Sequence, residues 1–453
     1  MFDIEWLTKI FTNNKLKQTN KNNIIKTVST DSRNIKGNSL FIPLKGDRFD
    51  GHDHVNEAIK NGAQAIIWDQ EKPLSIKELP IEVSVFYVSD TLKALQLLAA
   101  EYRKLINPKV IGITGSNGKT TTKDLLEATL TDTYMTVATK GNLNNHIGLP
   151  LTILNMKRHT EVLILEMGMS NFGEIELLSN IAKPDIAIIT NIGESHIEYL
   201  GSRKGIAQAK LEIIKSMNDK GTLVYDGDEL LLKNIEFKGD VVACGFSPTN
   251  TEHISDIKLT TNSTEFYVND MFFKVPLLGR HHAKNATFVI AVARLLNVND
   301  EKIKAGLNQI KLTNMRFELL VGRNNTTLIN DAYNASPTSM KASIEVVEEL
   351  EGYKEKILVL GDILELGSDF KQYYQDISKT INKMGTISEV YTYGEKSHLI
   401  NEYLKDNSNI NSRHFTDESS LVKELDKQLI KDNLLFFKAS RGIKLENIIN
   451  QLK

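Results

Sequence analysis

The chain has 453 residues, of which 41% are hydrophobic and 25% are charged, and its formal net charge is −2. A chain of this length exceeds one hydrophobic core and predicts several domains of an ordinary soluble protein. The near-neutral charge argues against a general nucleic-acid or membrane-surface binder, and the single cysteine, Cys244, excludes an internal disulfide. There is no run of about 18 apolar residues to indicate a membrane span, and the first residues do not resemble a signal peptide. We therefore expect a cytoplasmic enzyme.

Residues 1–105 have the pattern of a small α/β unit. Apolar runs predict strands at 39–44, 65–68 and 83–88, and helices at 54–61 and 91–105. Polar loops at 31–33 and 45–52 separate these elements. Such loops could bind the phosphates or sugar of a ligand, but their composition alone favours ordinary turns.

The segment Val110–Thr121, VIGITGSNGKTT, has the order of a strand, a glycine-rich loop and a helix start. Gly115 and Gly118 allow backbone N–H groups to approach a polyphosphate. Lys119 supplies a positive charge, and Thr120 offers a hydroxyl to Mg²⁺. The usual pattern is G-x-x-x-x-G-K-[ST], whereas only two residues separate these glycines. The order of elements nevertheless favours an ATP loop over an ordinary glycine turn.

Residues 106–314 alternate strand and helix patterns, which predicts a mainly parallel sheet flanked by helices. Apolar strands at 162–165 and 185–189 lead to Glu166 and to a loop that contains His196. Ligands of open α/β sheets bind at the carboxyl ends of the strands, so we expect both side chains beside the phosphate loop and its Mg²⁺. A carboxylate suits this hard cation, whereas imidazole is less usual there. His196 by itself would be interpreted as an ordinary loop histidine.

Lys210 lies on the apolar face of a predicted helix at 203–217, between Ile206 and Ile213. A buried lysine loses its proton or gains a partner, and a neutral amine can react with CO₂ to form a carbamate that holds Mg²⁺. Periodicity alone favours the other interpretation, in which the side chain snorkels to the edge of the helix.

The cluster at 279–286 opens a helix that is predicted to continue to Leu296. His281, His282 and Asn285 could contact a base or a ribose there, but in isolation the cluster favours helix capping.

Residues 315–453 show a second α/β alternation in a Rossmann-like layout. Strands are predicted at 327–329, 357–360, 390–393 and 434–437, and a helix at 339–350. No G-x-G-x-x-G follows any of these strands, so a nicotinamide or flavin dinucleotide site is unsupported.

Several motifs together resemble the Mur ligase family of peptidoglycan synthesis, over essentially the whole chain. They are TGSNGKTT at 114–121, GNLNNHIGLPLTIL at 141–154, NDAYNASPTSM at 330–340, LGDILELG at 360–367 and the N-terminal stretch at 30–55. The short glycine spacing of the ATP loop is typical of that family. NDAYNASPTSM is similar to the Asp-Ala-Tyr-Asn-Ala-Asn-Pro signature of the branch that adds D-alanyl-D-alanine, and sister ligases differ there.

The resemblance implies a role for individual residues. The implied ATP-binding residues are Gly115, Ser116, Asn117, Gly118, Lys119, Thr120, Thr121, Asn285, Arg316 and Asp331. The implied substrate-binding residues are Ser32, Arg33, Lys45, Gly46, Asp50, Gly51 and His52 for the UDP end, and Asn142, Asn144, Asn145, Tyr333 and Asn334. The implied metal ligands are Thr120, Glu166, His196 and Lys210 as its carbamate, and the implied catalytic residues are Lys119, Lys210, His196 and Arg316.

Two departures from the family pattern stand out. His282 occupies a position where the family commonly has asparagine, and Ser336 replaces the second asparagine of the signature. The first departure concerns contacts to the base, whereas the second keeps a small polar side chain.

The resemblance also implies a fold of three domains. These are a small N-terminal α/β domain that binds the UDP substrate (1–105), a central P-loop ATPase-type domain with a parallel or mixed sheet (106–314), and a C-terminal Rossmann-like domain that binds D-alanyl-D-alanine (315–453). Closure of the C-terminal domain is expected to hinge near Thr313–Met315.

The implied activity is an ATP-dependent, ADP-forming amide ligation. It joins D-alanyl-D-alanine to UDP-N-acetylmuramoyl-tripeptide through an acyl phosphate, with two Mg²⁺ ions, in cytoplasmic peptidoglycan precursor synthesis. The associated processes are cell wall biogenesis, cell shape, the cell cycle and cell division. We expect a monomer without nucleic-acid or membrane partners. Two rivals are another amide ligase of this fold, such as folylpolyglutamate synthase, and a P-loop nucleotide switch.

Overall fold

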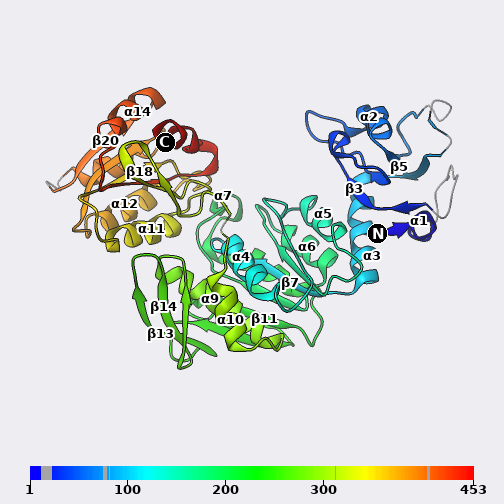
Figure 1. Cartoon of the computed structure of the whole chain (residues 1–453), viewed down its shortest axis with the longest axis horizontal. Helices are drawn as coiled ribbons and strands as arrows, with labels where there is room; N and C mark the ends of the chain where they lie inside the picture. The colour runs from blue at the N-terminus through cyan, green and yellow to red at the C-terminus, as the bar shows by residue number, and fades with distance from the viewer. Residues whose placement is uncertain (12–22, 75–78, 81, 312, 406–408) are drawn as a thin grey trace.

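The computed structural model describes residues 1–11, 23–74, 79–80, 82–311, 313–405 and 409–453. Three α/β units follow one another along the long axis of the molecule, with the N-terminal and C-terminal units on opposite sides of the central one (Figure 1). The α/β class and the three-unit order predicted from the sequence are confirmed.

The N-terminal unit is built on a four-stranded parallel sheet in the order β3-β4-β5-β6. Its strands are β3 (Thr27–Ser29), β4 (Ser39–Phe41), β5 (Ala63–Asp69) and β6 (Ser84–Val88), and its helices are α2 (Val55–Lys60) and α3 (Thr91–Ile106). A short antiparallel pair, β1 (Phe2–Asp3) and β2 (Ile24–Ile25), accompanies α1 (Ile4–Ile10).

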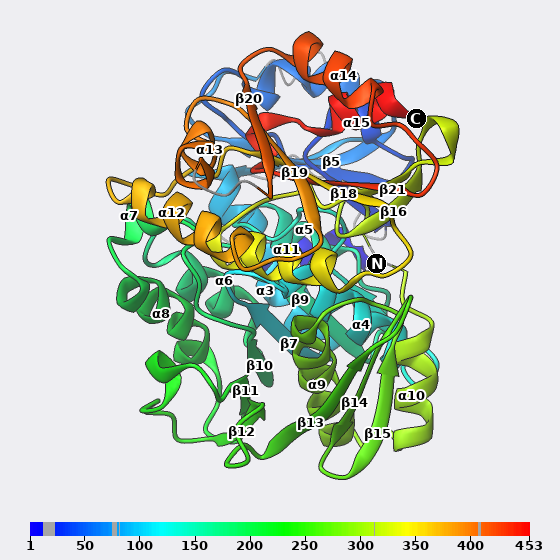
Figure 2. The same ribbon diagram turned by 90° about the vertical axis from the view of Figure 1, so that its left-hand side faces the viewer.

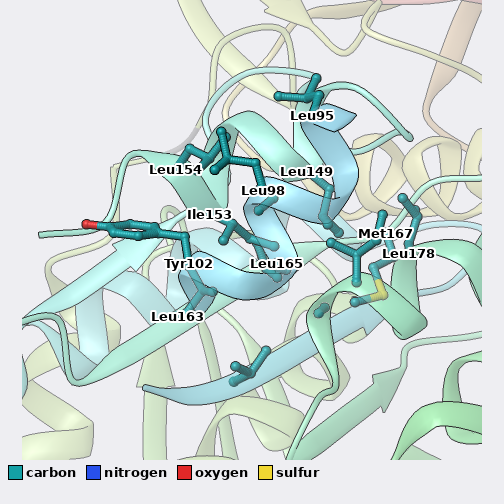
Figure 3. Packing of buried hydrophobic residues seen from close by; sticks show 14 of the residues in the cluster. Leu95, Leu98, Tyr102, Leu149, Ile153, Leu154, Leu163, Leu165, Met167 and Leu178 are labelled. Atoms are coloured by element: carbon teal, nitrogen blue, oxygen red, sulfur yellow. The ribbon is translucent and has the colours of Figure 1, made fainter. Parts of the chain in front are cut away.

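Helix α3 joins the N-terminal unit to the central one, although its sequence was assigned to the first unit. Its apolar face carries Leu95, Leu98 and Tyr102, which pack against α5, β9 and α6 of the central unit (Figure 3). The hydroxyl of Tyr102 donates a hydrogen bond of 2.8 Å to the carbonyl of Met156. The two units therefore share one hydrophobic core.

The central unit has a nine-stranded mixed sheet in the order β15-β14-β13-β12-β11-β10-β7-β9-β8. Its strands are β7 (Lys109–Thr114), β8 (Thr136–Ala138), β9 (Val162–Glu166), β10 (Ile186–Ile189), β11 (Thr222–Asp226), β12 (Asp240–Gly245), β13 (Glu252–Leu259), β14 (Thr264–Val268) and β15 (Met271–Val275). The strands from β8 to β13 run parallel, and β14 and β15 add an antiparallel edge.

Helices cover both faces of this sheet, because its central strands are apolar on both sides. The helices are α4 (Lys119–Leu130), α5 (Gly148–Leu154), α6 (Glu174–Ala182), α7 (Ile197–Leu200), α8 (Arg203–Leu211), α9 (Arg280–Leu295) and α10 (Asp300–Asn308). Val110 on β7 belongs to the core with α3, α5, α6 and α8, whereas its neighbour Ile111 belongs to the core with α4, α9 and α10. This alternation places successive side chains on opposite faces.

The C-terminal unit has a six-stranded sheet in the order β16-β17-β21-β18-β19-β20, with β16 antiparallel at one edge. Its strands are β16 (Glu318–Val321), β17 (Thr327–Asn330), β18 (Glu355–Gly361), β19 (Ile387–Tyr393), β20 (Asn411–Phe415) and β21 (Asn433–Lys438). Its helices are α11 (Pro337–Glu349), α12 (Phe370–Ile381), α13 (His398–Leu404), α14 (Glu418–Asp426) and α15 (Glu446–Leu452). Helix α11 lies on the side of this sheet that faces the central unit (Figure 2).

Candidate active site

The loop between β7 and α4 has the geometry of a phosphate cradle. Gly115 and Gly118 adopt positive φ angles of 149° and 82°. A Cβ atom at Gly115 would lie 1.8 Å from Oγ1 of Thr190, and one at Gly118 would lie 2.6 Å from Oδ1 of Asn285. Only glycine fits these two positions, so the loop can place its backbone at the N-terminus of α4, where an anion is favoured. The side chain of Lys119 folds onto the loop, and its Nζ donates to the carbonyl of Gly115 at 2.7 Å.

Glu166 lies beside this cradle, as predicted from the end of its strand. Because β7 and β9 are adjacent and parallel, Ile113 pairs with Glu166 at the carboxyl edge of the sheet. The carboxylate is 3% exposed, and it accepts hydrogen bonds from Oγ1 of Thr120 at 2.7 Å and from Nδ2 of Asn144 at 2.8 Å. Arg316 of the C-terminal unit donates from Nη2 to the same Thr120 hydroxyl at 2.8 Å.

Lys210 and His196 line the same cavity. Lys210 is 2% exposed, so the snorkelling interpretation is wrong: α8 buries the whole side chain. Burial and the neighbouring charge of Lys119 hold the pKa of Lys210 well below its usual value. His196 has a positive φ of 64°, and its Nδ1 lies 2.6 Å from Oε2 of Glu365 in the C-terminal unit. Burial lowers the pKa of His196, and the charge of Glu365 opposes that shift.

The polar residues at the start of α9 also face the cavity. The expectation that they cap the helix is wrong, because Gly279 occupies the N-cap position and no side chain caps it. Burial lowers the pKa of His281 to about 4, despite the opposing charge of Asp331. Burial, together with the neighbouring His281, also lowers the pKa of His282 well below its usual value. Nδ1 of His282 is buried and has no hydrogen-bond partner among the described residues. Both rings are therefore neutral near pH 7.

The C-terminal unit supplies the opposite wall. The guanidinium of Arg316 lies over the ring of Tyr333 at 4.3 Å, and that of Arg441 lies 5.9 Å from the same ring. Asp331, one of the implied ATP-binding residues, lines the cavity and directs its carboxylate to groups of its own unit. It accepts from the Phe317 N–H at 3.2 Å, the Ser343 hydroxyl at 2.8 Å and Nζ of Lys438 at 2.6 Å.

Direct hydrogen bonds join the N-terminal turn of α11 to the central unit. Ser336, where the family signature has asparagine, caps α11 and exchanges hydrogen bonds of 3.1 and 3.2 Å with the side-chain amide of Asn117 in the ATP loop. The hydroxyl of Thr338 donates to the carboxylate of Glu194 at 2.8 Å. Sequence reasoning missed Glu194, Thr338 and Lys438. No motif contains the first two as a pair, and Lys438 follows the strand predicted at 434–437 without any motif of its own.

The linker between the two units is anchored on the helix that follows the ATP loop. The backbone N–H and the hydroxyl of Thr313 both donate to Oδ2 of Asp124 on α4, at 3.1 and 3.0 Å. Met315 and Phe317, which flank Arg316, have positive φ angles of 66° and 53°. Such angles are unfavourable for side-chain-bearing residues and persist only where the surroundings hold them.

These groups enclose a cavity of about 460 Å³. The sequence-predicted residues that line it are Gly115, Ser116, Asn117, Gly118, Lys119, Thr120, Thr121, Asn144, Asn145, Glu166, His196, Lys210, Asn285, Arg316, Asp331, Tyr333 and Asn334. Asn142 does not line it and is exposed. Within the described parts of the chain, no group of three His, Cys, Asp or Glu side chains could hold a metal ion unaided.

The polar loops of the N-terminal unit are not part of this cavity. The residues Ser32, Arg33, Lys45, Gly46, Asp50, Gly51 and His52 lie on the unit at the other side of the molecule (Figure 1). Asp50 bonds to Lys72 and, at 2.6 Å, to Nδ1 of His52. Partial burial would raise the pKa of Asp50, but these hydrogen bonds outweigh it and keep the pKa below the usual range. Arg33 pairs with Asp31 at 2.9 Å, and its side chain remains 79% exposed.

Three family profiles match successive parts of the chain. They are "Mur ligase family, catalytic domain" over residues 24–103, "Mur ligase middle domain" over 113–293 and "Mur ligase, glutamate ligase domain" over 315–441. No helix among the described residues is both long and apolar enough to cross a membrane.

Individual proteins of this family are similar along the whole chain. The UDP-N-acetylmuramoyl-tripeptide–D-alanyl-D-alanine ligase of Bacillus subtilis is 45% identical over 95% of this chain and 93% of its own. A crystal structure of MurF from Acinetobacter baumannii superposes with a TM-score of 0.88 at 29% identity, covering 100% of this chain and 98% of that one. MurF ligase from Thermotoga maritima in complex with ADP gives a TM-score of 0.82 at 30% identity, covering 94% of this chain and 97% of that one.

Proposed function

This chain belongs to the Mur ligase family, and from that premise we propose that it joins D-alanyl-D-alanine to UDP-N-acetylmuramoyl-tripeptide with the cleavage of ATP to ADP and phosphate. The observation that carries the proposal is the cavity between the central and C-terminal units. One wall of it is a phosphate cradle, and the other bears the DAYNASP segment at 331–337. Nucleotide and acceptor can therefore meet in one enclosed space.

The chemistry begins with a nucleophilic carboxylate. An oxygen of the terminal carboxylate of the tripeptide attacks the γ-phosphorus of ATP, and the bond to the bridging oxygen of ADP breaks. The amine of D-alanyl-D-alanine then attacks the acyl carbon to form a tetrahedral intermediate. Phosphate leaves, the amine proton is lost, and the amide of the UDP-linked pentapeptide remains.

The residues of the cavity suit these steps. ATP, a carboxylate and an acyl phosphate are all anionic, so they repel one another unless cations offset the charge. Lys119 bonds to the carbonyl of Gly115 in the ATP loop, and Arg316 bonds to the hydroxyl of Thr120 at the start of α4. We assign both cations to the transferred phosphoryl group. Asn285 lines the same cavity, and we assign it to adenine on the family resemblance. Closure of the two units over the substrates would keep water from the acyl phosphate, which it would otherwise hydrolyse.

Magnesium fits the donor set at the cradle. Oxygen ligands at Thr120 and Glu166 match the preference of Mg²⁺, and the phosphates of ATP would complete its shell. Bound there, the ion would withdraw charge from the phosphoryl oxygens. We assign His196 and the carbamate of Lys210 to a second ion. The support for the carbamate is that Lys210 is buried and favours the neutral amine, the form that reacts with CO₂.

Asp331 is the site assignment that the structure modifies most. Its carboxylate is engaged by three groups of the C-terminal unit, so we assign it to the surroundings of the ribose rather than to a free acceptor for it. We place the UDP end of the substrate on the N-terminal unit, near Arg33 and the turn at 50–52. We place the muramoyl-peptide near Asn144 and Asn145.

We further propose that the protein acts as a monomer in the cytoplasm, in peptidoglycan precursor synthesis and thereby in cell wall biogenesis, cell shape and cell division.

A purified-enzyme assay tests the reaction. The protein is given ATP, Mg²⁺, D-alanyl-D-alanine and a UDP-muramoyl-tripeptide whose third residue is either L-lysine or diaminopimelate. One phosphate and one pentapeptide per ATP are expected with one of the two tripeptides. Phosphate release that ignores the dipeptide would instead favour a nucleotide switch, and glutamate addition to a folate would favour the folylpolyglutamate branch.

A further inference from the structure

Three charged residues of the C-terminal unit meet at the cavity: the cations Lys438 and Arg316 and the carboxylate of Asp331. Lys438, at the end of β21, has a side chain that is 4% exposed, and it pairs with Asp331 at 2.6 Å. Its Nζ also donates to the carbonyl of Asn334 at 3.3 Å. Arg316 makes no ion pair among the described residues, and its Nε is buried without a hydrogen-bond partner. Asp331 is the one carboxylate among the described cavity-lining residues of this unit, and it is thus taken by the lysine.

The same carboxylate holds the backbone that carries Arg316. Oδ1 of Asp331 accepts from the N–H of Phe317, and both Met315 and Phe317 have left-handed backbone conformations. Met315 is tied on its other side, because its N–H donates to Glu318 at 3.0 Å and its carbonyl accepts from the N–H of Tyr333 at 3.2 Å. The strained segment aims the guanidinium of Arg316 at Thr120 in the ATP helix.

We propose that Lys438 is a positioning residue that neutralises Asp331 and so leaves the guanidinium of Arg316 free to face the phosphates of ATP. Without Lys438, the mostly buried carboxylate of Asp331 has no cation, which is costly. Arg316 precedes Phe317, whose N–H already bonds to that carboxylate. The guanidinium of Arg316 is therefore the cation that turns from Thr120 to Asp331. His281 cannot take the place of Lys438, since it is neutral near pH 7 with a pKa lowered by burial to about 4.

The inference rests on the proposed function, and the test separates the two. Lys438→Met is compared with Lys356→Met, which removes another buried lysine from the same unit. Lys356 is 4% exposed and bonds to the Glu348 carbonyl and the Thr386 hydroxyl, away from the cavity. At pH 8, Lys438→Met is expected to lose about 100-fold in kcat with little change in the KM for ATP. Lys356→Met keeps the wild-type kcat.

The decisive variant is Lys438→Met combined with Asp331→Asn. The asparagine still accepts the Phe317 N–H but carries no charge, so kcat recovers about tenfold relative to Lys438→Met alone. No recovery, or an unchanged kcat in Lys438→Met, overturns the proposal. Equal losses in Lys438→Met and Lys356→Met also overturn it, because they indicate a general effect of removing a buried lysine.

A crystal structure of the Lys438→Met variant gives a readout that does not depend on activity. An ion pair between Arg316 and Asp331, with the hydrogen bond to Thr120 lost, is the expected result. Retention of the Arg316–Thr120 hydrogen bond overturns the proposal. Failure of the wild-type protein to form the amide would refute the proposed ligase function, and this structural result would still decide the role of Lys438.

Discussion

The ATP cavity and the polar loops of the N-terminal unit differ in how their polar groups are used. In the cavity, backbone geometry is fixed by glycines, and Lys119, Lys210 and Arg316 have no carboxylate as an ion-pair partner among the described residues. In the N-terminal loops, by contrast, Asp50 and Asp31 already pair with cations of their own unit. The first region is organised before its ligand arrives. The second is held by its own ion pairs, and its ligand must add to or displace them.

The largest effect is expected for Lys210→Ala in the cavity. Loss of the proposed carbamate would remove a metal ligand at the reacting phosphoryl group, so we expect kcat to fall about 1,000-fold or more. Formate is expected to restore part of the activity, because it supplies a small carboxylate in the space that is left. The control is Lys215→Ala. Lys215 is an exposed lysine five residues after Lys210, and it pairs with Glu176. An active enzyme whose Lys210 amine carries no added carboxylate in a crystal structure would contradict the carbamate.

Arg316→Ala is expected to have the next largest effect. The guanidinium meets charge that develops on the phosphoryl group, so kcat falls about 100-fold while ATP binding changes only slightly. Steady-state kinetics and calorimetry with a non-hydrolysable ATP analogue measure the two quantities. The control is Arg413→Ala, since Arg413 is an exposed arginine that pairs with Glu424. Lost affinity for ATP with normal turnover would argue against this role.

Arg33→Ala probes the N-terminal loops. Its guanidinium pairs with Asp31 but is exposed, so under the proposed function it can also bind a phosphate of UDP. The KM for the UDP-tripeptide is therefore expected to rise about tenfold, with kcat and the KM for ATP unchanged. The same Arg413→Ala control applies. A fall in kcat at an unchanged KM would indicate that Arg33 takes part in the reaction rather than in substrate binding. The ATP cavity and the N-terminal loops would then not differ in the way described.

Asp50→Asn is expected to show the smallest effect, on stability. The folded state holds the pKa of Asp50 below its usual value, so the charged carboxylate stabilises the fold above the unfolded pKa of about 4. This contribution is lost as the pH falls through the folded pKa. Thermal unfolding followed from pH 7 downwards should show a lower Tm for the variant at neutral pH and convergence with the wild type in acid. A Tm difference that grows in acid would contradict the ion-pair role.

Much of the fold could be predicted from the sequence, because β7, β9, β10 and β18 are long apolar runs between turn signals. Two strands of the C-terminal sheet were not predicted. β20, NSRHF, is mostly polar, and β16 exposes Leu319 and Val321 at the sheet edge. The periodic patterns of buried strands are weak in both, since edge strands bury little surface.

The candidate site was predicted only where a motif carries it. The ATP loop and Glu166 could be located because a glycine motif and a strand end fix where their groups lie. Periodicity favoured a snorkelling Lys210, and only the family resemblance implied a role for it in the site. The pairs Asp331–Lys438 and Glu194–Thr338 join residues more than 100 positions apart. Nothing in the local sequence indicates such partners. The pairing of β17 with β21 inside the C-terminal sheet brings Asp331 and Lys438 together, whereas the packing of the C-terminal unit on the central one brings Glu194 and Thr338 together.

The route of an oxygen atom tests the proposed reaction most directly. UDP-muramoyl-tripeptide with ¹⁸O at both oxygens of its terminal carboxylate is incubated with ATP, D-alanyl-D-alanine and the enzyme, and the released phosphate is analysed by mass spectrometry. Attack of the carboxylate on ATP predicts one ¹⁸O atom in each phosphate, because the acyl–oxygen bond breaks when the amide forms. Phosphate without ¹⁸O would show that water, not the carboxylate, receives the phosphoryl group.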